Sequence, residues 1–133
     1  MRRQGLQTLL ERHRPVDAAE TSHVRRMWDL LRVSGDPFSR DHFQPGHFTA
    51  SAFVLSPDER HILLIEHAKL GLWLQPGGHI DPQDADVFLA AGREVAEETG
   101  VADPIVLGGF PELLDVDIHT IPANPKKGEP AHE

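Results

Sequence analysis

Apolar residues near the start of the chain recur at helical spacing. A first set lies within residues 5–13 and is broken by Pro15. A second set follows Asp17-Ala-Ala-Glu20, which fits a capping box with Asp in place of Ser or Thr. The sequence therefore predicts two helices before Ser34-Gly35, with these apolar positions: Leu6, Leu9 and Leu10 in the first, and Val24, Met27, Trp28 and Leu31 in the second.

The spacing then changes to that of strands. Residues 48–55 (FTASAFVL) and 61–67 (HILLIEH) flank the turn Ser56-Pro57-Asp58-Glu59, so we expect a hairpin whose second strand is largely buried. A bend is expected at Lys69–Gly71. Further strands are predicted around residues 105–107 and over residues 113–121, the latter with Leu114, Val116 and Ile118 on one face, and a loop over residues 122–130.

Between these regions, residues 74–101 combine a glycine pair with an acidic helix. We expect Pro76-Gly77-Gly78 to form a turn in which glycine takes positive φ and approaches a ligand closely. A helix is predicted from Asp84 or Asp86 to Thr99, ending at Gly100 in the left-handed conformation. Its predicted packing face holds Phe88, Ala91, Gly92, Val95 and Thr99.

Three carboxylates gather on another side of this helix. Glu94, Glu97 and Glu98 stand at i, i+3 and i+4, and Arg93 can clamp Glu97 four residues on. The glutamates repel one another and lie in the last turns, where the helix dipole is also negative. A divalent cation would relieve both effects, and Mg²⁺ prefers such oxygen ligands. The alternative for a glutamate-rich helix is a solvated face.

Gly78 and residues 93–101 (REVAEETGV) together closely resemble the Nudix box, G-x5-E-x7-R-E-U-x-E-E-x-G-U, where U is apolar. The second half matches at every fixed position. The first half is one residue longer than the pattern, and its acidic position holds Asp84, with Asp86 as a rival.

The resemblance implies an α/β (α+β) fold, a Nudix-like α/β/α sandwich with a mixed sheet. It also implies bound Mg²⁺ or Mn²⁺ and hydrolysis of a nucleoside diphosphate linked to another group. Glu97 and Glu98 would bind the metal with the Gly77 carbonyl. Glu94 would be a further ligand or the general base, and Arg93 would orient Glu97. Gly78, in the predicted turn, and His79, which directly follows it, are candidates to contact substrate phosphate.

The resemblance covers roughly residues 46–122, which leaves both ends to be explained. We expect an N-terminal helical extension over residues 1–36 and a Nudix domain over residues 37–133. The family's domain normally continues with more strand and a final helix, so we expect C-terminal elements to be missing. Either the chain is truncated, or a second copy covers the exposed edge in a homodimer. The general base of many members lies after the box, and here it could lie beyond residue 133.

The composition limits the classes of partner and substrate that the protein can bind. The chain of 133 residues has a net charge of −8, no Cys and no apolar run long enough to span a membrane. The acidic charge argues against general nucleic-acid or anionic-membrane binding. Without Cys, disulfides and thiolate chemistry are excluded. We expect a cytoplasmic protein that acts on a small-molecule nucleoside diphosphate derivative.

Three functional interpretations of the box remain open. The chain is a phosphoanhydride hydrolase (a pyrophosphatase), a catalytically weak or inactive Nudix-like nucleotide-binding module, or an enzyme of altered reaction such as the family's isomerases. The altered first half of the box and the missing C-terminal part favour the module, and the complete second half favours the hydrolase. Trp73, just before the glycine pair, would line a base-binding pocket or fill the core.

Overall fold

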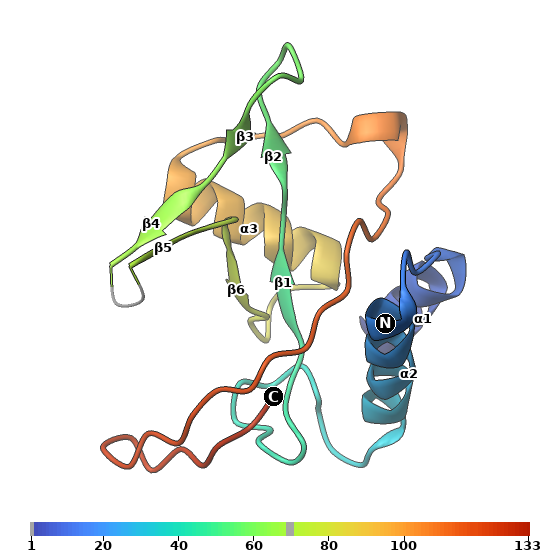
Figure 1. The fold of residues 1–133 in the computed structure, drawn as a ribbon, viewed down its shortest axis with the longest axis vertical. Coiled ribbons are helices and arrows are strands. Elements are labelled where there is room, and N and C mark those ends of the chain that lie inside the picture. Colours follow the sequence, from blue (N-terminus) through green and yellow to red (C-terminus); the bar gives the residue numbers. More distant parts are fainter. Residues whose placement is uncertain (1, 69–70) are drawn as a thin grey trace. The chain divides into compact units, whose positions relative to one another are not determined.

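A computed structural model of the protein describes residues 2–68 and 71–133 (Figure 1). The chain forms two compact units. One consists of the residues up to Phe48 together with Pro111–Glu133, and the other is the continuous stretch Thr49–Phe110. The expected bend at Lys69–Gly71 falls partly on residues outside the described ranges. The α/β fold class and the N-terminal helices are confirmed.

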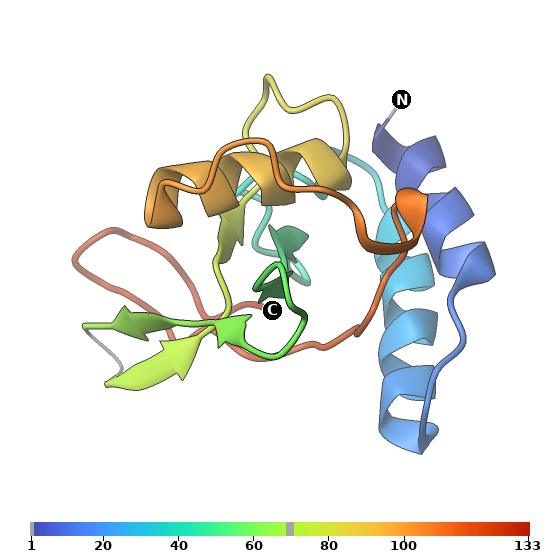
Figure 2. The same ribbon diagram turned by 90° about the horizontal axis from the view of Figure 1, so that it is seen from above.

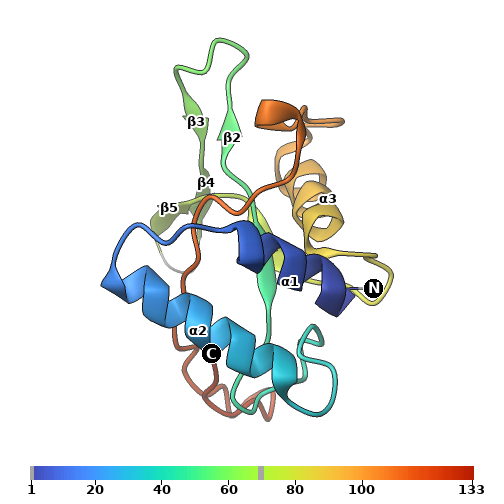
Figure 3. The ribbon, with the colours of Figure 1, turned by 90° about the vertical axis from the view of Figure 1, so that its right-hand side faces the viewer.

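The first unit is built on the two expected helices, α1 (Arg2–Arg12) and α2 (Ala18–Arg32), which pack side by side (Figures 2 and 3). Helix α1 begins three residues before the predicted start. Its Leu6 and Leu10 are buried, as is Leu31 of α2. None of the helices in the described part of the chain is long and apolar enough to cross a membrane.

The start of α2 contains a buried carboxylate. Asp17 caps the helix by accepting a hydrogen bond from the Glu20 N–H at 2.8 Å, as the capping pattern predicts. The side chain of Glu20 does not complete the capping box with Asp17. Its side chain instead accepts from the N–H of Val16 at 2.6 Å and from the N–H of Val116 at 3.1 Å, and it lies 2.8 Å from Nε2 of His13. Only 4% of Glu20 is exposed, so these partners replace its water.

The predicted strand over residues 113–121 is wrong. Val116 is buried, but Leu114 is 72% exposed, so the alternating face does not form. The Val116 N–H bonds to Glu20 rather than to a neighbouring strand, and pairing is limited to the isolated bridges Ile121–His132 and Asn124–Glu129.

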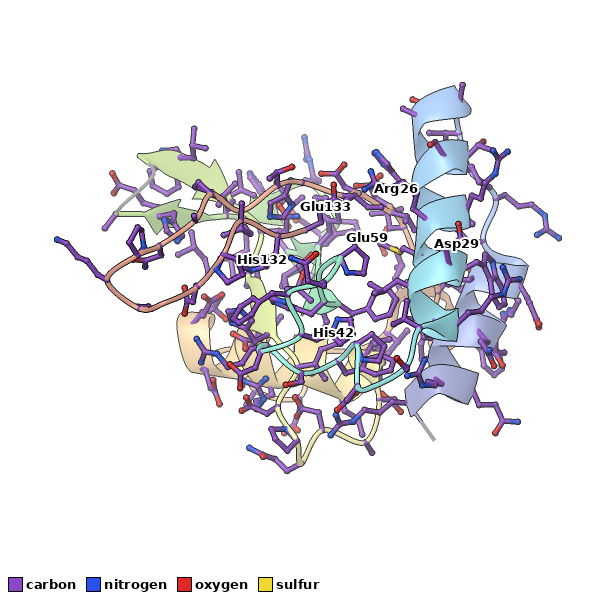
Figure 4. The ribbon with its side chains drawn as sticks, turned by 90° about the horizontal axis from the view of Figure 1, so that it is seen from below. Arg26, Asp29, His42, Glu59, His132 and Glu133 are labelled. Carbon is purple, nitrogen blue, oxygen red and sulfur yellow. The ribbon has the colours of Figure 1, made fainter. Side chains whose placement is uncertain are left out.

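The end of the chain contacts α2 and the loop that follows it. Figure 4 shows Arg26 of α2 and Glu133, whose side chains form an ion pair. The backbone carbonyl of Glu133 accepts from the His47 N–H at 2.8 Å, and the His132 ring packs edge-on against Phe43. These contacts make residues 111–133 part of the same unit as the helices.

In its described residues, the second unit contains three antiparallel strand pairs, one α-helix and one short 3₁₀ helix. The expected hairpin is present and turns at Ser56, whose N–H bonds to the His61 carbonyl. The strand bounds and pairs are: β1 (Thr49–Ser51) with β6 (Gly77–His79), β2 (Val54–Leu55) with β3 (Ile62–Leu63), and β4 (Ile65–His67) with β5 (Leu72–Leu74).

Two expectations about the apolar runs of this unit are wrong. Residues 61–67 are not largely buried, because Ile62 is 45% and Leu63 37% exposed on a ladder of only two strands. Residues 105–107 form no strand. Ile105 is 96% exposed, and the short 3₁₀ helix η1 (Leu107–Gly109) follows it, with Gly108 at a φ of 77°.

Helix α3 (Val87–Thr99) packs against β1 and β6 (Figure 1). It starts after Asp86, whose side chain caps the Leu89 N–H at 2.9 Å, and it ends at Gly100 with a φ of 72°, as predicted. The predicted packing face is only partly right because Phe88 is 40% exposed. The buried positions are Val87, Ala90, Ala91 and Val95, whose small side chains let the helix approach the strands closely.

Stability should depend on pH through Glu20. Its hydrogen bond from the Val16 N–H, aided by His13 and Val116, lowers the pKa of Glu20 below the ordinary value of 4.5. A carboxyl whose pKa is lowered in the folded state stabilises that state above its unfolded pKa. This contribution is lost as the pH falls through the lowered value. We expect Glu20→Gln to reduce the free energy of unfolding at neutral pH and to flatten its fall in acid.

Urea unfolding at pH values from ~7 to ~3 measures this effect. Glu11→Gln is the matched control because Glu11 is an exposed glutamate of the neighbouring helix. An identical pH profile for Glu20→Gln and the wild type would contradict the role of the buried carboxylate.

Candidate active site

The glycine pair lies in a strand and not in the predicted turn. Gly77 and Gly78 belong to β6, paired with Ser51 and Ala50 of β1, and neither takes positive φ. They are needed because their neighbours are close. A Cβ on Gly77 would lie 2.3 Å from the Cβ of Ser51, and one on Gly78 would lie 2.9 Å from the carboxyl oxygens of Glu94. The absence of side chains therefore lets β1 and α3 approach the same strand.

The Arg93 guanidinium joins the acidic groups around this strand. Its Nη1 donates to Glu94 Oε1 at 2.9 Å and to Glu97 Oε2 at 3.1 Å. Nη2 donates to Asp84 Oδ2 at 3.0 Å and to the backbone carbonyl of His79 at 2.8 Å. Nε also faces Asp84, at 3.2 and 3.3 Å from its two oxygens. All five N–H donors of the guanidinium thus have an acceptor.

These contacts fix both the charge and the orientation of Arg93. Its side chain is 20% exposed, while that of Asp84 is 7% exposed. The hydrogen bonds that Arg93 donates to Asp84, and then those to Glu94, raise the pKa of Arg93 further above its already high value. The guanidinium therefore stays cationic, and it offsets the repulsion between carboxylates that the sequence pattern predicts.

The structure separates the tasks of the two aspartates that compete for the first acidic position of the box. Asp84 pairs with Arg93 and also accepts from the Asp81 N–H at 2.8 Å. Asp86 caps the first turn of α3. Asp84 is therefore the acidic residue that contacts Arg93 of the box, although the loop that carries it is one residue longer than in the family pattern.

The three glutamates differ in their surroundings. Glu94 is the most enclosed, with a side chain 14% exposed above Gly78. Glu97 is 60% exposed and bonded to Arg93, which is the contact expected at i+4. Glu98 is exposed, and its Oε2 accepts from the Gly77 N–H at 2.9 Å. The helix thus places one carboxylate against the strand and two at its open edge.

The other candidates lie along the same stretch of chain. His79 is exposed at the end of β6, where its backbone carbonyl binds Arg93. Trp73 of β5 is 63% exposed, so it does not fill the core. The sequence did not indicate the bond from the Gly77 N–H to Glu98, or the part played by the His79 carbonyl, because any residue supplies those backbone groups.

The donor chemistry of this cluster fits a hard divalent cation. Glu94, Glu97 and Glu98 each use one carboxyl oxygen in the bonds described above, and each keeps a second oxygen of the type that Mg²⁺ and Mn²⁺ prefer. They are not arranged as a formed metal site. Across residues 2–68 and 71–133, no three His, Cys, Asp or Glu side chains are placed to hold an ion.

This combination of an arginine hub, three helical glutamates and a bare glycine strand lies within a recognised sequence family. The profile of the NUDIX domain matches residues 45–130. The chain belongs to the Nudix family. The match includes the whole box, from the glycine strand to Val101, and it extends into both compact units.

One Nudix relative is a protein of Bacillus subtilis (strain 168) named "Putative 8-oxo-dGTP diphosphatase". It is 43% identical to this chain over 54 residues, which are 40% of this chain. The aligned part is 36% of the relative, so the similarity spans about a third of that protein. The likeness supports the family assignment.

The different tasks of the two aspartates can be tested with the same substitution at each. Asp84→Asn removes the charge that pairs with Arg93, and we expect the free energy of unfolding to fall by about 2 kcal/mol. Asp86→Asn should change it by less than about 0.5 kcal/mol, because Asn is as good an N-cap as Asp. Denaturant unfolding of the two variants at neutral pH measures the difference. Equal losses would show that Asp84 is not the partner on which Arg93 depends.

Proposed function

We propose that this protein hydrolyses a phosphoanhydride bond in a nucleoside diphosphate linked to another group, and that it needs Mg²⁺ or Mn²⁺ to do so. The observation that carries the proposal is the Arg93 network. It gathers Glu94 and Glu97 beside the glycine strand of a chain that belongs to the Nudix family. The charge of −8 fits a protein that takes its nucleotide together with cations.

The metal would be held by Glu97 and Glu98 with the Gly77 carbonyl, and Glu94 would be a further ligand or the general base. When bound, it would supply a Lewis acid for a phosphate oxygen and lower the pKa of a bound water. Glu97 and Glu98 suit this role because both are exposed at the open edge of the site.

The chain's own groups would do the rest. Arg93 would act as a positioning residue, because its five bonds hold the Glu94 and Glu97 carboxylates and leave it no donor for substrate. Glu94, if it is not a ligand, would take a proton from the attacking water. The exposed His79 side chain and the backbone at Gly78 would lie beside the substrate phosphates.

The name of the Bacillus subtilis relative suggests a first substrate to test. We include 8-oxo-dGTP and unmodified nucleoside triphosphates beside nucleotide sugars and dinucleotide polyphosphates. All of these contain the phosphoanhydride bond that the proposal requires.

One observation favours a second candidate, a Nudix-like module that binds a nucleotide without turning it over. The first half of the box is one residue longer than the family pattern and holds Asp84 at the acidic position. Such a module would keep the strand and helix of the box and bind nucleotides, but it would release no hydrolysis product.

A turnover assay distinguishes these candidates. The protein is mixed with each substrate of the panel and Mg²⁺ or Mn²⁺, and the released products are separated and quantified. We expect metal-dependent cleavage that falls by about 100-fold or more in Glu98→Gln and in Glu97→Gln, because each substitution removes a charged oxygen ligand. Glu59→Gln, in the turn between β2 and β3, makes the same change of charge and should keep full activity.

Thermal unfolding of each variant shows whether it remains folded. Full activity in a folded Glu98→Gln protein would contradict the assigned role of Glu98. Nucleotide binding without any product would favour the binding module.

A further inference from the structure

We propose that Trp73 and Glu66 form the base-recognition site of this protein and that the base they take is guanine. This inference rests on the proposed function to the extent that it supposes a nucleotide substrate. It adds the chemical class of the base and two residues that determine specificity.

The two side chains are neighbours across a strand pair. In the antiparallel ladder of β4 and β5, Glu66 lies directly opposite Trp73. Residues that pair in this way point to the same face, with Cβ atoms about 5 Å apart. The flanking pairs, Ile65 with Leu74 and His67 with Leu72, point to the other face. One face of this ladder thus presents an aromatic ring beside a carboxylate.

Both groups are available to a ligand. Trp73 is 63% exposed and makes no ring contact with any other described residue. Glu66 is exposed as well, and in residues 2–68 and 71–133 its side chain forms no hydrogen bond or ion pair. Indole is a good stacking platform because every base has a flat π-face, and such stacking commonly strengthens binding by about tenfold or more. The ring alone would not distinguish one base from another.

The carboxylate supplies the distinction. A carboxylate only accepts hydrogen bonds, so it suits a base edge that carries donors alone. Guanine presents two adjacent donors, N1–H and the N2 amino group, which match the two oxygens of Glu66. Adenine presents an acceptor at N1 beside its single amino group, so one carboxyl oxygen would face a lone pair. The pair therefore favours guanine over adenine. An oxidised guanine with the same edge would also fit.

The position of the pair suits a nucleotide whose phosphates lie at the box. Trp73 precedes Gly77 by four residues, so their Cα atoms are at most about 14 Å apart along an extended chain. The Gly77 N–H in turn holds the Glu98 carboxylate. A nucleoside diphosphate can bridge such a length, with its base on the ladder and its phosphates beside β6 and α3.

Calorimetric titration with GDP, IDP and ADP tests the proposal without relying on turnover. The protein carries Glu98→Gln, so that bound nucleotide is not consumed. We expect GDP to bind about tenfold more tightly than ADP, with IDP between them because it lacks the N2 amino group. Glu66→Gln should bring the GDP and ADP affinities to within about twofold, and Trp73→Ala should weaken both by about tenfold.

Two variants control for general damage to the ladder. Leu72→Ala removes a large exposed side chain from the opposite face of β5, and Glu59→Gln removes a carboxylate from the β2–β3 turn. Both should bind GDP as the parent does. In a Trp28→Phe background Trp73 is the only tryptophan, and its fluorescence should be quenched as GDP binds.

The outcomes separate this inference from the proposed activity. Equal affinity for GDP and ADP, unchanged binding in Trp73→Ala, or no binding by the folded protein would overturn the guanine site. Hydrolysis by the wild type whose base preference survives both Glu66→Gln and Trp73→Ala would overturn it and leave the activity standing. Guanine-selective binding with no hydrolysis of any substrate would support the guanine site and overturn the proposed activity.

Discussion

The geometry of the box depends on one guanidinium. Arg93 lies in α3, yet it bonds to the backbone of β6 and to Asp84 in the loop between them, as well as to two glutamates of its own helix. Five donors in a rigid plane fix the relative positions of strand, loop and helix in a way that a single flexible ammonium would not. The surrounding carboxylates keep the guanidinium charged, and its charge keeps them together. Because each group holds the others in place, removal of any one of them would weaken the remaining hydrogen bonds.

The close packing around β6 makes this network possible. Gly77 and Gly78 carry no side chain at the places where Ser51 and Glu94 lie against the strand. Helix α3 meets the strands through small residues, such as Ala90 and Ala91, and this brings its polar side up to the strand edge. Each of these residues is unremarkable alone. Together they set how close the helix lies, and therefore which atoms Arg93 can reach.

The sequence predicted those features that depend on local spacing. A helix start at one of two aspartates, of which the structure uses Asp86, the stop at Gly100, the Arg93–Glu97 contact and the β2–β3 hairpin all follow from residues a few positions apart. The expectations from sequence were wrong where contacts between residues distant in the chain determine the structure. An apolar run such as Ile62–Leu63 is buried only if something covers it, and the 113–121 pattern forms a strand only if another strand binds it. Two adjacent glycines favour a turn because glycine is conformationally free, but in the structure they are needed because Ser51 and Glu94 leave no room for a side chain.

The division of the chain also sets the order in which its parts can be completed during synthesis. The unit with the box is continuous from Thr49 to Phe110, whereas the helical unit is assembled from both ends of the chain. The bond between Glu20 and Val116 joins residues 96 positions apart. On a ribosome, which adds residues in order, α1 and α2 emerge first but wait longest for the segment that satisfies their buried carboxylate. The box unit lies in the sequence between these helices and residues 111–133, so all its own residues are available earlier.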